Sequence, residues 1–353
     1  MEEIVVIKDL LIGYQKSALR KVVAGPVNLS LSAGEFICMI GQNGSGKTTL
    51  LKTLAGVQRP LKGSVEIRGK NISHYRPSQL SKILSVVLTD RVAVSNLDVY
   101  ALVGLGRYPY TNWLGGLTDK DKKIIDWALK STDTKKFINR QLGELSDGEL
   151  QKVMVARALA QDTDIILLDE PTAHLDLPNR IEIFLLLKKL ALETGKVILV
   201  STHELDLALQ SADKIWLIDT QKTENQEDFG EYGNHIFSGV PEDMVISGVF
   251  QKAFEKHGMT FDKMTGRFKI NTGYNYRVNL SGNKTLFSWT ERALERVGFK
   301  VDNSKSSSIQ IEIDEENRKW FLKVGDKNFI ASSIEELIYK IKQSSNYELV
   351  LQK

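Results

Sequence analysis

The sequence predicts an α/β fold in which a mainly parallel sheet lies between helices. Apolar residues follow one another, instead of alternating with polar ones, in Glu35–Gly41, Asp164–Glu170 and Lys196–Thr202. That pattern is typical of strands that are buried on both faces of a parallel sheet. Between the last two runs, Ile181–Gly195 has the length of a helix and ends in glycine, a common helix stop. A strand, a helix and a second strand in this order form a parallel crossover unit.

Composition places the chain among ordinary globular proteins. Of its 353 residues, 42% are hydrophobic and 26% are charged, which excludes a disordered or fibrous chain and allows two unequal domains. The formal net charge is only +3, so we expect no nucleic acid as a partner. The single cysteine, Cys38, excludes an internal disulfide and favours a reducing compartment. The longest apolar runs are far shorter than the roughly 20 residues of a membrane-spanning helix.

Further strands are expected on either side of this parallel sheet. Ile4–Tyr14 and Ser64–Gly69 suggest a small antiparallel sheet beside it. Lys214–Asp219 and His235–Gly239 flank a polar stretch that is typical of an exposed hairpin loop. The first two thirds of the chain therefore combine a parallel core with antiparallel additions.

A second domain is expected at the C-terminal end. The stretch between about Lys252 and Tyr274 is charged, contains glycine and lacks a long apolar period. We therefore expect one domain over residues 1–255 and an accessory α+β domain over residues 256–353. Its predicted order is β-α-β-β-α, from the segments NYRVNL, LFSWTERALERVGF, SIQIEI, KWFLKV and SIEELIYKIK. Regulation, self-association and simple stabilisation are all compatible with this region.

The segment GQNGSGKT matches the pattern G-x-x-x-x-G-K-[ST] of a phosphate-binding loop, and it lies between a predicted strand and a predicted helix. Its glycines let the backbone wrap closely around phosphates, and the following helix directs its positive end at them. Lys47 supplies a cation for the β- and γ-phosphates, and Thr48 offers a hydroxyl to Mg²⁺. The residues expected to contact the nucleotide here are Gly41, Asn43, Gly44, Ser45, Gly46, Lys47, Thr48 and Thr49.

Two neighbouring carboxylates, Asp169 and Glu170, end the second apolar run. They are expected at the C-terminal edge of the sheet, where open α/β sheets bind their ligands. Asp169 can hold Mg²⁺ directly or through water, and Glu170 can take a proton from an attacking water. Adjacent acids at a strand end are otherwise solvated loop residues, and the phosphate-binding loop is what favours the functional interpretation.

Four further features resemble those of ATP-binding-cassette (ABC) ATPases, and the resemblance covers roughly Ile4–Gly239. LSDGELQKVMVARAL (Leu145–Leu159) is similar to the signature motif and its helix, and AHLD (Ala173–Asp176) is similar to the D-loop. His203 matches the switch histidine, and Tyr14 matches the aromatic residue that stacks on adenine. The resemblance implies a P-loop NTPase of the ABC type, with a mixed sheet, an antiparallel β-subdomain and a helical subdomain. It also implies hydrolysis of ATP with Mg²⁺.

The resemblance implies a head-to-tail homodimer that encloses two ATP molecules. Ser146 and Gly148 of one protomer would contact the γ-phosphate held by Lys47 of the other, and Asp176 would contribute from the D-loop. Ser146 also begins an S-x-x-E capping box, and the two roles are compatible. His203 would hydrogen-bond the γ-phosphate and orient the attacking water. Taken alone, a histidine or a strand-end tyrosine such as Tyr14 is more often a packing residue.

Two positions depart from the family pattern. The family usually has a glutamine in the loop after the second β-element, where SVVLTD (Ser85–Asp90) stands here; Thr89 takes the best matching position, with Asp90 as the alternative. Either side chain can offer an oxygen to Mg²⁺ or to the attacking water, with a shorter reach than glutamine. Asp147 replaces the first glycine of the signature motif. Because a carboxylate repels a triphosphate, we expect Asp147 to cap the helix and to face away from the nucleotide.

Within the family, Asn96–Asp121, with GRYP at Gly106–Pro109, is similar to the ATPases of iron-siderophore, haem and vitamin B12 importers. The resemblance implies a peripheral protein on the cytoplasmic face of the inner membrane, beneath a dimeric permease that an extracytoplasmic binding protein supplies. An importer for an inorganic metal ion stays open, as does a soluble ABC ATPase without a permease. A phosphate-loop kinase or GTPase is disfavoured, because it would not need LSDGE, AHLD or His203.

Overall fold

The computed structural model describes residues 2–16, 19–88, 97–111, 115–220, 233–254, 259–263, 266–270, 276–282, 284–303 and 307–344. The chain divides into two compact units. The N-terminal unit comprises Met1–Phe254 and Lys263–Arg267, and the C-terminal unit comprises Glu255–Asp262 and Phe268–Lys353. None of the described helices has the length and apolar character that crossing a membrane would require.

A six-stranded sheet forms the centre of the N-terminal unit. Its strands, in spatial order, are β10 (His235–Gly239), β9 (Lys214–Asp219), β3 (Phe36–Gly41), β8 (Val197–Thr202), β7 (Ile165–Asp169) and β6 (Leu84–Val87). All neighbouring strands pair in parallel except β10, which is antiparallel to β9. Every residue of β3, β7 and β8 is buried. This confirms the prediction of a parallel sheet whose central strands are covered on both faces.

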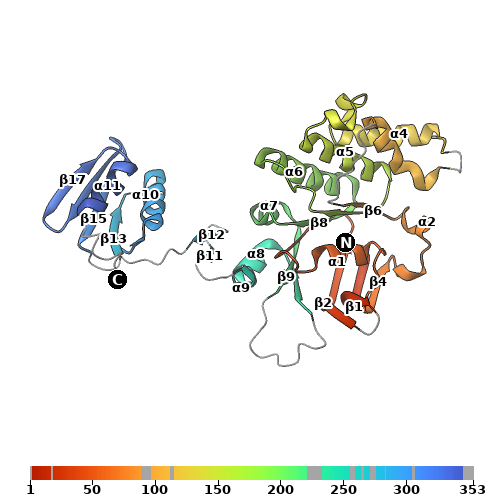
Figure 1. Cartoon of the computed structure of the whole chain (residues 1–353), viewed down its shortest axis with the longest axis horizontal. Helices are drawn as coiled ribbons and strands as arrows, with labels where there is room; N and C mark the ends of the chain where they lie inside the picture. Colours follow the sequence, from red (N-terminus) through yellow and green to blue (C-terminus); the bar gives the residue numbers. More distant parts are fainter. Residues whose placement is uncertain are drawn as a thin grey trace. The chain divides into compact units, whose positions relative to one another are not determined.

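Helices cover the two faces of this sheet (Figure 1). On one face, Leu50 and Leu54 of α1 (Lys47–Leu54) pack in a core with Ile37 and Met39 of β3. On the other face, Phe184 of α6 (Leu177–Thr194) meets Phe36 edge to face, with ring centroids 6.0 Å apart. α6 ends as predicted at Gly195, which has a left-handed φ of 67°.

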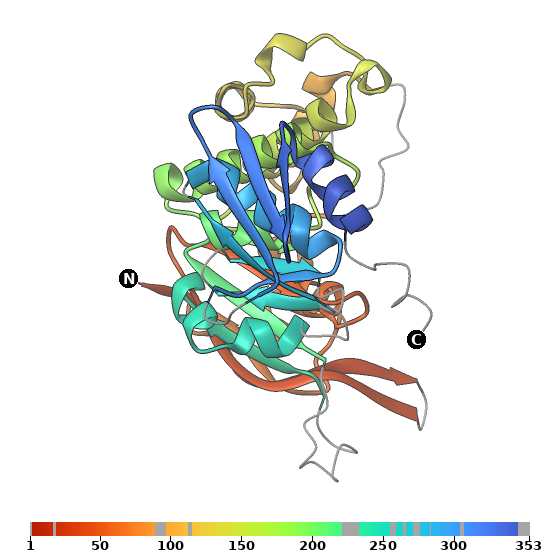
Figure 2. The same cartoon turned by 90° about the vertical axis from the view of Figure 1, so that its left-hand side faces the viewer.

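The predicted antiparallel sheet is also present in this unit. Its strands, in spatial order, are β2 (Leu19–Ser32), β1 (Glu3–Lys16), β4 (Lys62–Ile67) and β5 (Lys70–Asn71). The hairpin of β1 and β2 is drawn in red in Figure 2. Apolar residues of β1 such as Ile7 and Leu10 join the core cluster that contains α1. The β-sheet additions and the parallel core are therefore packed as one body.

A helical lobe lies between β6 and β7 in the chain. It contains α3 (Val99–Gly104), the 3₁₀ helix Leu105–Tyr110, α4 (Asp119–Ser131) and α5 (Asp147–Ala160). The GRYP residues fall in the 3₁₀ helix, where Arg107 is only 2% exposed. Arg107 donates to Asp121 Oδ1 over 2.8 Å and to the Ala160 carbonyl over 2.9 Å. A Cβ at Gly106 would lie 2.4 Å from the Arg157 carbonyl oxygen, so this turn needs glycine.

The remaining elements of the N-terminal unit are short helices at its surface and along its connections. They are the 3₁₀ helices Ile72–His74, Lys135–Phe137 and Leu142–Glu144, and α2 (Pro77–Leu80), α7 (Leu205–Ser211), α8 (Pro241–Ile246) and α9 (Val249–Phe254).

The described part of the C-terminal unit contains a five-stranded sheet and two helices. In spatial order the strands are β14 (Phe299–Val301), β13 (Tyr276–Ser281), β15 (Ile309–Asp314), β16 (Lys319–Val324) and β17 (Lys327–Ala331), with α10 (Lys284–Arg296) and α11 (Ile334–Ser344). A separate pair consists of β11 (Met259–Asp262) and β12 (Arg267–Ile270). The predicted order β-α-β-β-α omitted four of these strands. Three of the four are only three or four residues long, and β17 is an edge strand of largely exposed residues.

Candidate active site

The phosphate-binding loop connects the end of β3 to the start of α1. Gly44 and Gly46 have φ values of 77° and 113°, in the region that favours glycine. At Gly46 a Cβ would also lie 2.5 Å from Val23 Cγ1. The hydroxyl of Ser45 is buried and has no hydrogen-bond partner among the described residues. The loop is therefore a tight backbone turn that retains an unsatisfied donor.

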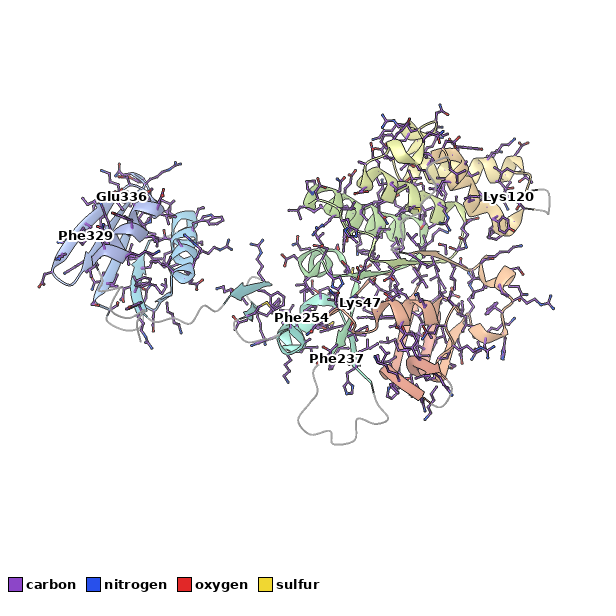
Figure 3. All side chains as sticks on the ribbon, in the orientation of Figure 1. Lys47, Lys120, Phe237, Phe254, Phe329 and Glu336 are labelled. Carbon is purple, nitrogen blue, oxygen red and sulfur yellow. The ribbon has the colours of Figure 1, made fainter. Side chains whose placement is uncertain are left out.

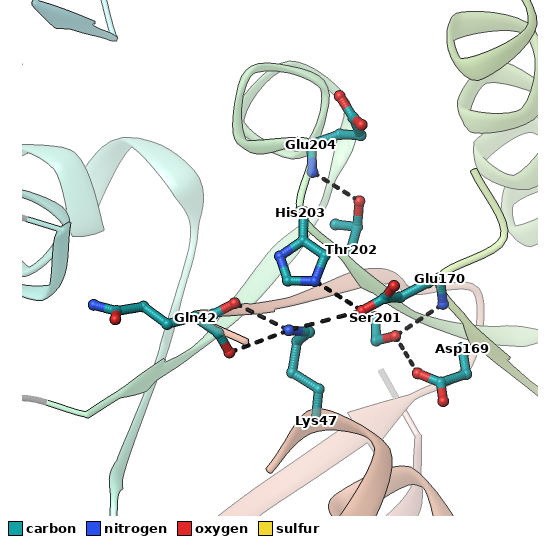
Figure 4. A network of polar contacts seen from close by, with 9 residues as sticks. Gln42, Lys47, Asp169, Glu170, Ser201, Thr202, His203 and Glu204 are labelled. Carbon is teal, nitrogen blue, oxygen red and sulfur yellow. Dashed lines mark hydrogen bonds and ion pairs between the residues drawn. The ribbon is translucent and has the colours of Figure 1, made fainter. Parts of the chain in front are cut away.

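Lys47 lies at the first position of α1, in the interior of the N-terminal unit (Figure 3). Its ammonium donates to the carbonyls of Gly41 and Gln42 over 3.0 and 3.4 Å, and it lies 3.9 Å from Glu170 Oε1 (Figure 4). Burial lowers the pKa of Lys47 below the ordinary lysine value, while the charges of Glu170 and Asp169 oppose this shift. The cation is thus held across the loop by neutral oxygens, which a phosphate can replace.

The residues after Lys47 divide between the surface and the core. Thr48 is exposed, whereas Thr49 is buried. The hydroxyl of Thr49 lies 2.9 Å from the hydroxyl of Tyr14, whose side chain is 52% exposed. The structure therefore brings Tyr14 beside the phosphate-binding loop, with its hydroxyl tied to α1 and much of its ring open to solvent.

The acidic pair lies at the C-terminal end of β7, as the apolar run predicted. Ser201 of β8 organises it: its hydroxyl donates to Asp169 Oδ1 over 2.6 Å and accepts the Glu170 amide over 2.9 Å (Figure 4). Glu170 has a φ of 49°, a left-handed conformation that is strained for a residue with a side chain and persists where its surroundings hold it. Asp169 is only 4% exposed. One carboxylate is thus fixed in the interior while the other turns toward Lys47.

His203 follows β8, one strand away from the acidic pair. Its Nε2 lies 2.8 Å from Glu170 Oε1, and the two side chains are 39% and 30% exposed. The candidate base and the candidate switch histidine are therefore in direct contact, beside the Lys47 ammonium. A water at this edge would meet a carboxylate that is already oriented by a histidine.

The signature segment forms the N-terminus of α5. Ser146 is the N-cap: its hydroxyl accepts the Glu149 amide over 3.3 Å, and Glu149 Oε2 accepts the Ser146 amide over 2.9 Å. The hydrogen bond from the Ser146 backbone lowers the pKa of the Glu149 carboxyl. The expectation that Asp147 caps this helix is wrong, because the cap requires an extended backbone and Asp147 is already the first helical residue. There its exposed carboxylate complements the helix dipole.

Asn179, which belongs to none of the motifs, lies between Asp176 of the D-loop and Gly148 of the signature helix. Asp176 caps α6, and its Oδ1 accepts the Asn179 backbone amide over 3.2 Å and the Asn179 side-chain amide over 2.6 Å. A Cβ at Gly148 would lie 2.6 Å from Asn179 Oδ1. Asn179 thus occupies the space that a side chain at position 148 would need. This contact joins the signature motif and the D-loop within one chain.

The two candidates for the missing glutamine, Thr89 and Asp90, lie outside the described residues. β6, which leads to them, ends at Val87. The structure therefore describes β6 but not the contacts of Thr89 or Asp90.

Comparison with known proteins identifies the family. A family model described as ABC transporter matches residues 24–173, a range that includes the phosphate-binding loop and the acidic pair. An uncharacterized ABC transporter ATP-binding protein of Methanocaldococcus jannaschii is 38% identical over 263 residues, which are 74% of this chain and 85% of that protein. The chain belongs to the ABC transporter family of ATP-binding proteins.

Other matches of this ABC ATPase extend the comparison. The iron(3+)-hydroxamate import ATP-binding protein of Bacillus subtilis is 39% identical over 188 residues, 53% of this chain and 70% of that protein. A dimeric ATP-binding cassette bound to ADP and phosphate, in a post-hydrolysis state, is 29% identical, with a TM-score of 0.52 over 60% of this chain and 93% of that one. Residues 275–342 match a model described as the iron ABC transporter C-terminal domain.

Two residues of this ABC ATPase site were not predicted. Ser201 lies directly opposite Asp169 in the parallel pairing of β7 and β8, and a hydroxyl within an apolar run was the available signal. Asn179 lies in the first turn of α6, and nothing in its sequence context marks a contact with Gly148. Both contacts depend on how separate elements are placed, which the motifs alone do not specify.

Proposed function

We propose that this chain is the ATP-hydrolysing subunit that powers import of an iron chelate, such as a siderophore or haem, or of cobalamin through a separate permease. The observation that carries hydrolysis is the contact of Glu170 with His203 beside Lys47, at the edge of the parallel sheet. The iron C-terminal family model and the iron(3+)-hydroxamate relative support the choice of substrate.

The phosphate-binding loop holds the substrate in this proposal. Lys47 exchanges its carbonyl contacts for the β- and γ-phosphates, and the amides of Asn43, Gly44, Gly46 and the start of α1 donate to the same oxygens. The exposed ring of Tyr14 stacks on the adenine, because two flat π-systems attract one another. The polar contacts position the phosphates, and the ring positions the base.

The residues around the loop fit a magnesium ion. Thr48 offers an exposed hydroxyl and Asp169 a carboxylate, and both are hard oxygen ligands of the kind that Mg²⁺ prefers. When bound, Mg²⁺ neutralises charge on the β- and γ-phosphates. Ser201 holds the Asp169 carboxylate through its hydroxyl. Thr89 would add a further oxygen from the loop after β6.

Glu170 acts as the general base in this proposal. It takes a proton from the water that attacks the γ-phosphate, the bond from the γ-phosphorus to the β–γ bridging oxygen breaks, and ADP leaves. His203 orients the carboxylate and hydrogen-bonds the phosphate. Ser146 and Gly148 of the partner protomer present the N-terminus of α5 to that phosphate, and Asp176 supports this surface from the D-loop. The site is thus completed in a head-to-tail homodimer, and the dimeric cassette with ADP and phosphate supports this arrangement.

The proposed setting is the cytoplasmic face of the cell membrane. The dimer docks peripherally beneath integral-membrane permease subunits, and an extracytoplasmic binding protein delivers the chelate. Residues 1–255 act as the nucleotide-binding domain and residues 256–353 as an accessory domain, a division that the two compact units support.

Affinity purification of the full chain from native membranes tests this proposal. We expect an integral-membrane permease to co-purify, and its companion binding protein to bind a ferric siderophore more tightly than zinc. Recovery of the chain without any membrane protein would favour a soluble ABC ATPase. A companion that binds zinc or manganese but no ferric chelate or cobalamin would replace the proposed substrate with a metal ion.

A further inference from the structure

The five-stranded sheet of the C-terminal unit has both helices on one face (Figure 1). Leu280, Ile311 and Leu322 point to that face and form a core with Leu294 of α10 and Leu337 of α11. Burial alternates along β15 and β16, so every second side chain points to the opposite face. No helix of the described part of this unit covers that second face, which we call the open face.

Strand register places the residues of the open face in two rows that cross the sheet. The first row, in which each residue pairs with the next, is Asn279, Gln310, Lys323 and Asn328. The second row, displaced by two residues on each strand (toward the N-terminus on the antiparallel β16), is Ser281, Glu312, Phe321 and Ile330. All eight residues line a hollow with a volume of about 750 Å³.

The size and lining of this hollow suit a small molecule better than a protein. Small-molecule sites occupy roughly 300–1,000 Å³, whereas a stable protein interface buries about 800 Å² on each partner around an apolar centre. Of the eight residues in the two rows, Phe321 and Ile330, which are 40% and 54% exposed, are the large apolar ones. The other six positions of the two rows carry polar or charged side chains.

The polar groups of the open face define the chemistry of an occupant. Lys323 stands between the amides of Gln310 and Asn328 on the neighbouring strands, a set of donors that matches a carboxylate. Glu312 is the diagonal neighbour of Lys323, and no ion pair joins the two or ties either to another described side chain. The side-chain oxygen of Asn279 is buried without a hydrogen-bond partner among the described residues. An exposed cation, Lys323, and an exposed acceptor, the Glu312 carboxylate, are therefore available on one surface.

We propose that the open face binds a small organic acid with a flat apolar body. Its carboxylate contacts Lys323, Gln310 and Asn328, and its body lies on Phe321. Diagonal positions on paired strands are about 7–8 Å apart, so a hydrogen-bond donor at the far end of such a molecule contacts Glu312. The residues of this site belong to the C-terminal unit and those of the nucleotide site to the N-terminal unit, and the proposal does not depend on the function proposed for the nucleotide site.

Equilibrium dialysis of the full chain with 4-hydroxybenzoate tests the proposal, because this probe carries a carboxylate and a hydroxyl at opposite ends of a flat ring. Millimolar or tighter binding is expected, with weaker binding of benzoate, which lacks the donor, and of 4-hydroxybenzamide, which lacks the charge. Failure of 4-hydroxybenzoate to bind, or equal binding of all three compounds, would overturn the proposal.

A pair of lysine variants locates the site. Lys323→Met should weaken binding of 4-hydroxybenzoate about tenfold, the typical loss for one charge-assisted hydrogen bond at a partly exposed site. Lys319→Met removes the same charge from the same face of β16 but lies outside the hollow, so its affinity should match that of the wild type. Equal affinities of Lys323→Met and the wild type would contradict the site, and circular dichroism verifies that both variants fold.

A second copy of the chain is the competing occupant of the open face. Sedimentation equilibrium of the wild type and of Ile330→Ser distinguishes it. Self-association that Ile330→Ser abolishes, together with no binding of 4-hydroxybenzoate, would assign the face to an interface between copies and would overturn the proposal. Unchanged association of Ile330→Ser, with probe binding intact in the wild type, supports it.

Discussion

The two large sheets of this molecule differ in how many of their faces are covered by helices. The six-stranded sheet has helices on both faces, and its strands β3, β7 and β8 are buried at every position. The five-stranded sheet has helices on one face, and burial alternates along β15 and β16. When helices cover both faces of a sheet, the ends of its strands remain for binding a ligand. When helices cover one face, the other face can also bind a ligand.

The polar residues of the two units follow this difference. In the N-terminal unit, Asp169, Glu170, Ser201 and His203 all lie at or just beyond the ends of β7 and β8. In the C-terminal unit, Gln310 and Lys323 lie within strands, on the open face. In the N-terminal unit the polar side chains cluster at the strand ends and in the loops that follow them. In the C-terminal unit they lie in rows across a face of the sheet, as the strand register dictates.

The largest effect, on the rate of ATP hydrolysis, is expected at the C-terminal ends of β7 and β8. Glu170→Gln keeps the shape of the side chain but removes the proposed base, so phosphate release at saturating ATP should fall about a thousandfold, with nucleotide binding retained. Glu204→Gln is the matched control, because Glu204 also follows β8 but pairs with Arg180 over 2.6 Å. Wild-type hydrolysis by Glu170→Gln would show that this edge does not hold the base.

An intermediate effect is expected when the burial of the two sheets is compared directly. Leu199→Ala in β8, where the side chain is 0% exposed, should lower the free energy of unfolding by about 3 kcal/mol, since it leaves a cavity between two covered faces. Ile330→Ala on the open face, where the side chain is 54% exposed, should cost less than about 1 kcal/mol. Urea unfolding measures both, and equal losses would break the contrast between the sheets.

The smallest effect is expected at the contact between the D-loop and the signature helix. Gly148→Ala places a Cβ 2.6 Å from Asn179 Oδ1, and this overpacking should lower the free energy of unfolding by about 1 kcal/mol. Asn179→Ala in the same chain should restore most of the loss, because it vacates that space. A double-mutant cycle by urea unfolding measures the coupling, and strictly additive effects would mean that the two residues do not contact each other.

Sequence patterns predicted the N-terminal unit better than the C-terminal unit, for a physical reason. Continuous apolar runs such as Val197–Thr202 identify a doubly covered strand without knowledge of its neighbours. Short or edge strands such as β14 and β17 bury few side chains, so their sequences carry little pattern and both were missed.

The candidate site likewise contains residues that the sequence predicted and residues that it did not. The phosphate-binding loop and the acidic pair are local motifs that could be identified from the sequence, and in the structure Lys47 Nζ lies 3.9 Å from Glu170 Oε1. Ser201 and Asn179 act through contacts between separate elements, which depend on strand register and helix placement rather than on any one segment. The assignment of Asp147 as a cap failed because Ser146, one residue earlier, has the extended backbone that a cap needs.

Arg107 has a mechanical consequence for the helical lobe. Its guanidinium, buried at 2% exposure, joins the start of α4 to the end of α5 and lies 3.9 Å from the centre of the Tyr110 ring. Separating these helices would leave a buried charge without its partner, which typically costs about 3–5 kcal/mol. Lysine cannot reproduce the forked geometry of the guanidinium. The start of α4 and the end of α5 should therefore hold their relative position as one rigid unit.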